Sequence, residues 1–141
     1  MSKVDFAIGD AARQSGVKVP TIRYYEQIGL LPAASRTEGN RRLYDHRDLD
    51  RLAFIRHARE LGFSIDAIRE LLSLSDNPDT SCERADDIAS RQLAEVEQRL
   101  KRLKALQKEL KRMVVECGHG RVCDCRVIEV ISDHRLCHTA H

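Results

Sequence analysis

The longest run of helical periodicity in the chain extends from residue 80 to residue 116. Apolar residues recur there at steps of three and four, and no Pro or Gly interrupts them before Gly118. Thr80 and Glu83 have the spacing of a capping box, which predicts that the helix begins at Thr80. The apolar positions have coiled-coil spacing, and we call them the apolar seam: Ala89, Leu93, Val96, Leu100, Leu103, Leu106, Leu110 and Met113. We therefore expect one long helix that packs against a partner helix.

Two cysteines at the ends of this helix predict how it pairs. Cys82 lies in the first turn, and Cys117 follows the last residue. At about 1.5 Å per residue the two thiols are about 50 Å apart, so one chain cannot bring both to one ion. Two helices packed antiparallel would place Cys82 of one chain beside Cys117 of the other, twice by symmetry. The sequence thus predicts a homodimer with a thiol site at each end.

Shorter periodic segments precede the long helix. Residues 6–14 have one apolar helical face and end at Ser15-Gly16, and Pro20 opens a second helix over residues 21–27. Two short helices joined by a turn that contains glycine are typical of a helix-turn-helix. An ordinary helical hairpin would have the same pattern.

The next segments predict a wing and two more helices. Residues 36–44 are polar around Gly39-Asn40, which favours a two-stranded turn whose arginines contact phosphate, or else a solvated hairpin. Residues 45–61 and 64–74 have helical apolar faces, with Gly62 between them. We expect their apolar side chains, including Phe54 and Phe63, to form a core.

The composition of the chain indicates the compartment in which the protein works and the chemistry of its cysteines. The chain has 141 residues, 42% of them hydrophobic and 33% charged, with a net charge of +2. No apolar run approaches the roughly 20 residues of a membrane span, and no signal peptide follows Met1, so we expect a cytoplasmic protein. Its five cysteines then stay reduced and indicate metal or redox chemistry. The small net charge is less informative than its distribution, since residues 36–59 hold seven arginines and four acids.

Several motifs in this order resemble the MerR family of transcription regulators. They are Thr21-Ile22-Arg23-Tyr24-Tyr25-Glu26, Gly29-Leu30-Leu31-Pro32, Asn40-Arg41-Arg42-Leu43-Tyr44, Ala58-Arg59-Glu60-Leu61-Gly62-Phe63-Ser64 and Ile68-Arg69-Glu70-Leu71-Leu72. The similarity covers residues 4–131. Cys82, Cys117 and Cys125 make the chain most similar to the soft-metal sensors of that family.

The resemblance implies that the chain binds promoter DNA. Residues 21–27 would enter the major groove, and two heads of a homodimer would read a palindromic site between promoter hexamers. The metal-bound dimer would distort that spacer and so act on RNA polymerase indirectly, as an activator. The residues expected at the DNA are Lys18, Thr21, Arg23, Tyr24, Arg36, Arg41, Arg42 and Tyr44. No catalytic residues are expected, because no nucleophile motif, Gly-rich phosphate loop or redox Cys pair in a βαβ context is present.

The thiol-rich segment 117–125 predicts the metal site. Thiolates suit soft or borderline ions such as zinc, cadmium, lead or mercury, and a helix N-terminus favours the thiolate of Cys82. Cys117, Cys125 and the partner chain's Cys82 are the expected ligands, and Cys123 and His119 compete for a further place. Three thiolates supply the negative charge that a divalent ion requires.

Two other sensors remain open within the same family. Cys117 and Cys125 alone would satisfy a monovalent ion, Cu(I), Ag(I) or Au(I), and their spacing resembles that of the family's copper sensors. Cys117, Cys123, Cys125 and Cys137 could instead hold an iron–sulfur cluster, or thiols could pair on oxidation. The copper and iron–sulfur alternatives leave Cys82 unused.

The predicted fold is mainly α, a winged helix-turn-helix head followed by a long antiparallel dimerisation helix and a C-terminal metal-binding loop. The boundaries are a DNA-binding domain at 1–75, a linker at 76–79 and the dimerisation helix at 80–116. The metal-binding loop and a short helix occupy 117–133, and 134–141 form a mobile tail.

Overall fold

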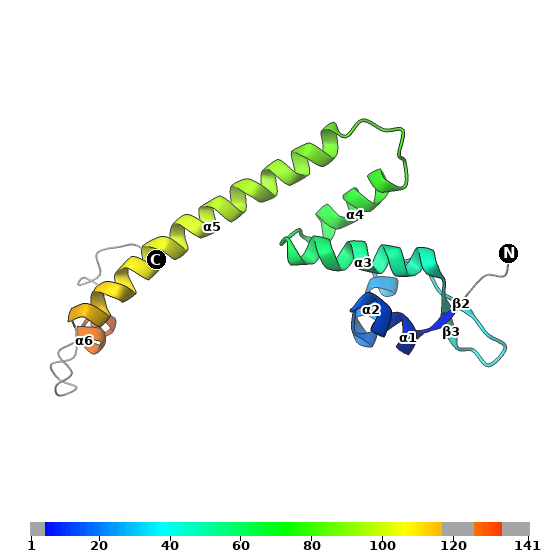
Figure 1. Cartoon of the computed structure of the whole chain (residues 1–141), viewed down its shortest axis with the longest axis horizontal. Coiled ribbons are helices and arrows are strands. Elements are labelled where there is room, and N and C mark those ends of the chain that lie inside the picture. Colours follow the sequence, from blue (N-terminus) through cyan, green and yellow to red (C-terminus); the bar gives the residue numbers. More distant parts are fainter. Residues whose placement is uncertain (1–4, 117–125, 134–141) are drawn as a thin grey trace. The chain divides into compact units, whose positions relative to one another are not determined.

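The computed structural model describes residues 5–116 and 126–133, which fall into two compact units. We call the residues up to Ile88 the head unit and those from Ala89 onward the stem unit. The described residues are mainly helical, as predicted, with a helix-turn-helix head and a long helix after it (Figure 1). None of the described helices is long and apolar enough to cross a membrane.

Helices α1 (Ile8–Ser15) and α2 (Val19–Gln27) form the predicted helix-turn-helix. Gly16 ends α1 in the left-handed region at φ 74°, and its N–H donates to the carbonyl of Ala12 at 3.0 Å. Helix α2 begins two residues earlier than predicted, at Val19. Pro20 is compatible with this start, because proline lacks only an N–H that a first turn leaves unpaired.

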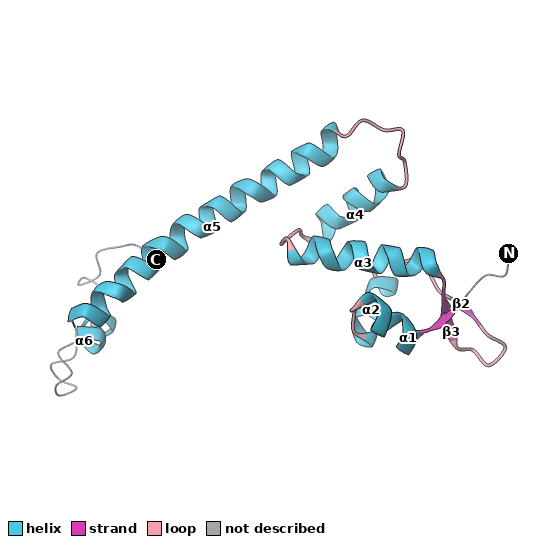
Figure 2. Ribbon diagram, in the orientation of Figure 1, coloured by secondary structure: helices cyan, strands magenta, loops and turns pink. Residues whose placement is uncertain are grey.

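Three short strands form one antiparallel sheet in the order β1-β3-β2 (Figure 2). They are β1 (Phe6–Ala7), β2 (Ser35–Arg36) and β3 (Arg42–Tyr44). Strands β2 and β3 are the predicted wing, and Asn40 turns between them at φ 63°. The prediction that residues 6–14 are all helical was wrong at Phe6–Ala7, because these two residues pair with β3 instead.

Helices α3 (His46–Glu60) and α4 (Ile65–Ser75) begin one residue after the predicted starts at residues 45 and 64, which are their N-caps. The Asp45 carboxylate accepts from the N–H of Asp48, and the Asp48 carboxylate accepts from the N–H of Asp45, both at 3.0 Å. At α4, the Ser64 hydroxyl accepts from the N–H of Ala67 at 3.1 Å. These caps fix the starts of two helices that supply six of the thirteen buried core residues of the head unit.

The core of the head unit combines α1–α4 with the central strand β3. Its buried side chains are Ala11, Val17, Ile22, Tyr25, Leu30, Leu31, Tyr44, Leu49, Leu52, Ile55, Ala58, Ile68 and Leu72. Phe63 packs against this core from its edge, as expected. The expectation for Phe54 was wrong, because its side chain is 37% exposed and lines a surface pocket.

Helix α5 (Glu83–Glu116) is the long helix, and it begins three residues later than predicted. The carbonyl of Cys82 accepts the first helical hydrogen bond, from the N–H of Asp86 at 2.9 Å. The hydroxyl of Ser81, rather than that of Thr80, accepts from the N–H of Glu83 at 3.2 Å. Cys82 therefore occupies the N-cap position. Helix α6 (Arg126–Ser132) agrees with the short helix predicted there.

Candidate functional site

The exposed face of α2 carries the residues predicted to meet the DNA groove. Arg23 is exposed, Tyr24 is 49% exposed, and Thr21 is partly buried in the first turn. Lys18 is exposed and forms the N-cap of α2 with extended backbone. Tyr25 faces the other way and is buried in the core. Alternate faces of one short helix thus separate possible DNA contacts from core packing.

The wing turn is held by its own hydrogen bonds. The guanidinium of Arg36 donates to the carbonyl and side-chain oxygens of Asn40 at 3.2 and 3.3 Å. The Thr37 hydroxyl accepts from the N–H of Arg41 at 3.1 Å, and the Arg41 side chain is exposed. A defined turn therefore presents Arg41 to solvent, as a phosphate contact would require.

Arg42 and Tyr44 lie on β3 and both contact Glu26 of α2. The Tyr44 hydroxyl donates to Glu26 Oε1, and Arg42 Nε lies 3.3 Å from Glu26 Oε2. Burial, the hydrogen bond to Glu26 and the charge of Glu26 raise the pKa of Tyr44 far above its ordinary value, and Arg42 opposes the shift in part. Tyr44 is fully buried, so its DNA contact stays a prediction that its present geometry does not favour. Sequence reasoning gave Glu26 no role, although an acid among basic residues was a usable signal.

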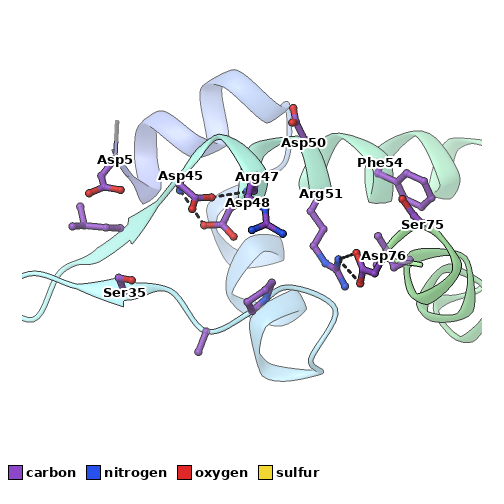
Figure 3. A pocket seen from close by; sticks show the side chains of 14 residues that line it. Asp5, Ser35, Asp45, Arg47, Asp48, Asp50, Arg51, Phe54, Ser75 and Asp76 are labelled. Atoms are coloured by element: carbon purple, nitrogen blue, oxygen red, sulfur yellow. Dashed lines mark hydrogen bonds and ion pairs between the residues drawn. The ribbon is translucent and has the colours of Figure 1, made fainter. Parts of the chain in front are cut away.

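A polar pocket of about 530 Å³ opens beside α3, and Figure 3 shows its lining. Asp45 and Asp48 in its wall cap α3. Arg51 donates from Nε to the carbonyl of Leu30 at 2.8 Å and pairs with Asp76 at 3.2 Å. These four charged side chains therefore hold helix ends and loops together, which explains their presence without a ligand.

Cys82 is the one predicted metal ligand within the described residues. Its thiol is exposed, and Sγ lies 3.8 Å from Asp86 Oδ2. The other four candidates, Cys117, His119, Cys123 and Cys125, lie outside the residues that the structure describes. Residues 5–116 and 126–133 by themselves contain no group of three possible His, Cys, Asp or Glu ligands. A site of three such ligands that uses Cys82 would therefore need residues outside 5–116 and 126–133, or residues of a second copy.

An ion pair ties the start of α5 to α4 within the head unit. Arg84 Nε contacts Glu70 Oε1, and Arg84 Nη2 donates to Glu70 Oε2 at 3.0 Å. A planar guanidinium that meets both carboxylate oxygens fixes orientation as well as distance. The turn that carries Cys82 is thus joined to the helix-turn-helix core by side chains two residues away.

The apolar seam is exposed along most of α5, whereas Leu106 is partly buried and Met113 is buried. Leu103 is 61% exposed, and Leu93, Leu100 and Leu110 are exposed to a similar degree. Leu103, Leu106, Leu110 and Val114 line an open hollow of about 630 Å³. A run of large apolar side chains on one helix face is typical of an interface with another helix.

Helix α6 is joined to the end of α5 by an ion pair. Arg126 Nε lies 2.7 Å from Glu116 Oε2, and Arg112 lies between Glu109 and Glu116, at 2.5 and 3.3 Å from their carboxylates. Val130 of α6 and Met113 of α5 are both buried. The residues on either side of the thiol-rich segment are therefore close together.

Comparisons with known proteins agree with this arrangement. Residues 6–75 match the model of the MerR HTH family regulatory proteins, and residues 49–113 match a model described as MerR, DNA binding. The chain is 42% identical over 130 residues to the HTH-type transcriptional regulator ZntR of Escherichia coli (strain K12), covering 89% of this chain and 92% of that protein. It is 33% identical over 127 residues to the mercuric resistance operon regulatory protein of Bacillus cereus, covering 89% and 96%.

A solved structure extends the likeness to three dimensions. The transcription regulator PbrR691 of Ralstonia metallidurans CH34, in complex with lead(II), matches with a TM-score of 0.75 and 36% identity, covering 89% of this chain and 98% of that one. Regulation of transcription, rather than catalysis, is what these relatives have in common. The family models, the relatives and the helix-turn-helix with its wing lead to one conclusion: the chain belongs to the MerR family of transcription regulators.

Proposed function

We propose that the chain is a dimeric transcriptional activator that responds to a divalent soft metal. Its winged helix-turn-helix binds a palindromic promoter spacer, and residues of α5 and the thiol-rich segment hold the metal. The domain boundaries drawn from the sequence assign DNA binding to residues 1–75, dimerisation to 80–116 and metal binding to 117–133. Zinc, cadmium, lead and mercury all suit the donor set.

The observation that carries the proposal is the position of Cys82. Its thiol is exposed at the N-cap of α5, where the helix dipole favours an anion. The same helix exposes an apolar seam that needs a second copy. An antiparallel pairing of two such helices would bring Cys82 of one chain to Cys117 and Cys125 of the other. A bound divalent ion would supply positive charge that three thiolates neutralise.

The relatives support metal as the effector. PbrR691 was solved with lead(II), and the Bacillus cereus relative is named for mercuric resistance.

The DNA side of the proposal depends on exposed basic side chains that a fixed scaffold presents. Arg23 and Tyr24 on α2 would reach the groove, and Arg41 at the wing would contact phosphate. Distortion of the spacer takes a few kcal/mol, so a metal that biases two dimer conformations by a similar amount is sufficient.

Competitive metal titration of the reduced dimer tests the metal site. We expect Cys82→Ser to weaken divalent binding by at least about 100-fold, since even the loss of a residue that only supports a ligand costs about 10–100-fold. Cys137→Ser is the matched control, because it also removes one thiol but should leave the affinity unchanged. Binding should weaken as the pH falls, because protons compete for the thiolates.

The same titration separates the alternatives. Divalent binding that survives Cys82→Ser unchanged would exclude the cross-chain site. Tight Cu(I) binding that does not depend on Cys82 would instead assign the chain to the monovalent sensors, as the spacing of Cys117 and Cys125 suggests. A thiol-specific gain of DNA distortion without metal would favour the redox alternative.

A further inference from the structure

Glu26 is an acid on the helix predicted to enter the DNA groove. It belongs to α2, and its side chain is only 11% exposed. Both of its carboxylate oxygens contact residues of the wing strand β3, Oε1 through Tyr44 and Oε2 through Arg42. One side chain of the recognition helix thus joins two residues of the wing that lie 16 and 18 positions later in the sequence.

Tyr44 makes this connection rigid. It is fully buried and lies in the central strand of the sheet, opposite Phe6 of β1. Its ring is packed in the core, so its hydroxyl has little freedom to move. The oxygen of Glu26 that accepts this hydroxyl is therefore fixed relative to the sheet.

Arg42 is the exposed end of the same connection. Its side chain is 31% exposed, and its contact with Glu26 uses Nε. A guanidinium has five N–H donors, so the two terminal nitrogens can still meet a phosphate while Nε holds to Glu26. Glu26 therefore orients Arg42 without using the part of the side chain that would grip DNA.

We propose that Glu26 is a positioning residue for sequence recognition, fixing α2 and the wing in one relative orientation so that groove and phosphate contacts form together. The inference rests on the proposed DNA binding. It adds a residue that touches no DNA but decides how well the two contacting elements fit one site.

Charge alone predicts the opposite effect of removing this acid. A carboxylate near a basic surface repels phosphate, so its neutralisation should strengthen binding to every duplex alike. Loss of positioning should instead weaken the preferred site and leave other sequences bound as well as before, or better. The ratio of the two affinities distinguishes these effects.

The experiment compares Glu26→Gln, Tyr44→Phe and Glu38→Gln in the full-length dimer. Glu38 is an exposed acid in the wing turn, so its variant removes the same charge without touching Tyr44 or Arg42. Each protein is titrated at one fixed salt concentration with two duplexes. One is selected by the wild-type dimer from a random pool, and the other is its shuffled sequence.

We expect Glu26→Gln to lower the ratio of selected to shuffled affinity about tenfold, the size of effect of one lost ionic hydrogen bond. Tyr44→Phe should lower it about threefold, because Arg42 still contacts Glu26. Glu38→Gln should change both affinities together and leave the ratio as in the wild type. Thermal unfolding of each variant shows whether the head has folded, and Tyr44→Phe, which keeps the packed ring, supports the test if Glu26→Gln does not fold.

A wild-type ratio in both Glu26→Gln and Tyr44→Phe would overturn the positioning role. The positioning role would also be overturned if Glu26→Gln and Glu38→Gln both bound the two duplexes more tightly and by the same factor. The loss of one negative charge would then explain the whole effect. A wild-type dimer that does not prefer the selected duplex would overturn the proposed function itself, and this inference with it.

Discussion

The apolar residues of the head unit and of the stem unit are covered in different ways. In the head unit, large side chains such as Ile22, Leu52 and Ile55 are completely buried by elements of the same chain. In the stem unit, leucines of comparable size such as Leu100 and Leu103 remain about half exposed or more. The head unit therefore has the core of an independent domain, whereas α5 needs a second copy to cover its seam.

This difference gives the head unit and the stem unit different roles. A head that folds by its own core can keep its DNA-reading geometry while the stem changes its pairing. A stem whose stability depends on a partner is the part in which a bound metal can shift an equilibrium.

The largest expected effect comes from a substitution that disrupts the stem unit alone. Leu103→Glu places a charge in the seam, and we expect the dimer to dissociate and affinity for the selected duplex to fall at least about 100-fold, since two half-sites are no longer read together. Sedimentation and gel shift measure the two effects. Lys101→Glu is the control on an exposed position outside the seam. A dimer that tolerates Leu103→Glu would show that the seam is not the interface.

The second prediction concerns a substitution that destabilises the head unit alone. Ile55 is fully buried, so Ile55→Ala should lower the free energy of unfolding by about 2–5 kcal/mol. Urea denaturation should give the same loss at every protein concentration. For Leu103→Ala the loss should instead depend on concentration, because the residue is covered only in the dimer. Equal concentration dependence for both variants would remove the distinction between the units.

The third prediction concerns Tyr44 at alkaline pH. A raised pKa means that the folded protein holds the hydroxyl proton more tightly than the unfolded chain does. Below pH 10 both states are protonated and the residue adds no pH dependence. Above that pH the unfolded chain loses the proton first, so stability should fall by up to about 1.4 kcal/mol per pH unit.

Tyr44→Phe isolates this contribution from other groups that titrate in the same range. The difference in unfolding free energy between wild type and variant should be constant below pH 10 and should then move in favour of the variant. A parallel pH dependence of the two proteins would contradict the buried hydroxyl.

The smallest expected effect compares how α3 and α5 begin. Asp45→Ala removes the reciprocal cap of α3 and should cost about 1 kcal/mol in urea denaturation. Asp50→Ala, on an exposed position of the same helix, is the control. Ser81→Ala, before α5, should cost less, because its hydroxyl makes one bond at a helix start that lies in solvent. A greater loss for Ser81→Ala would mean that the start of α5 is more tightly fixed than its contacts show.

Local signals in the sequence predicted the starts of α3 and α4 and the end of α1. Asp45 and Ser64 cap α3 and α4 by contacts to the next turn, and Gly16 ends α1 by a backbone preference of its own. Such contacts join residues two to four apart, so their pattern is visible in the chain.

Contacts between distant residues were missed. Strand β1 has two residues, too few to show any period, and it exists because β3 lies beside it. Phe54 was expected in the core, but it lies outside the stripe of buried residues that includes Leu52 and Ile55, and it lines a surface pocket. The role of Glu26 depends on its contacts with two residues of another element, β3. The ligands of the thiol-rich segment stay a prediction from the sequence.

The pairing of Glu116 with Arg126 has a consequence for whatever ion the chain captures. These two side chains meet at 2.7 Å, and the nine residues 117–125 run between them. Closing a nine-residue ring from an open chain would take about 2 kcal/mol by its length term alone. Because α6 is already fastened to α5, that entropy is lost when the protein folds. If the segment holds an ion, as proposed above, that ion would find Glu116 and Arg126 already paired, and more of its binding energy would be left to act on the dimer.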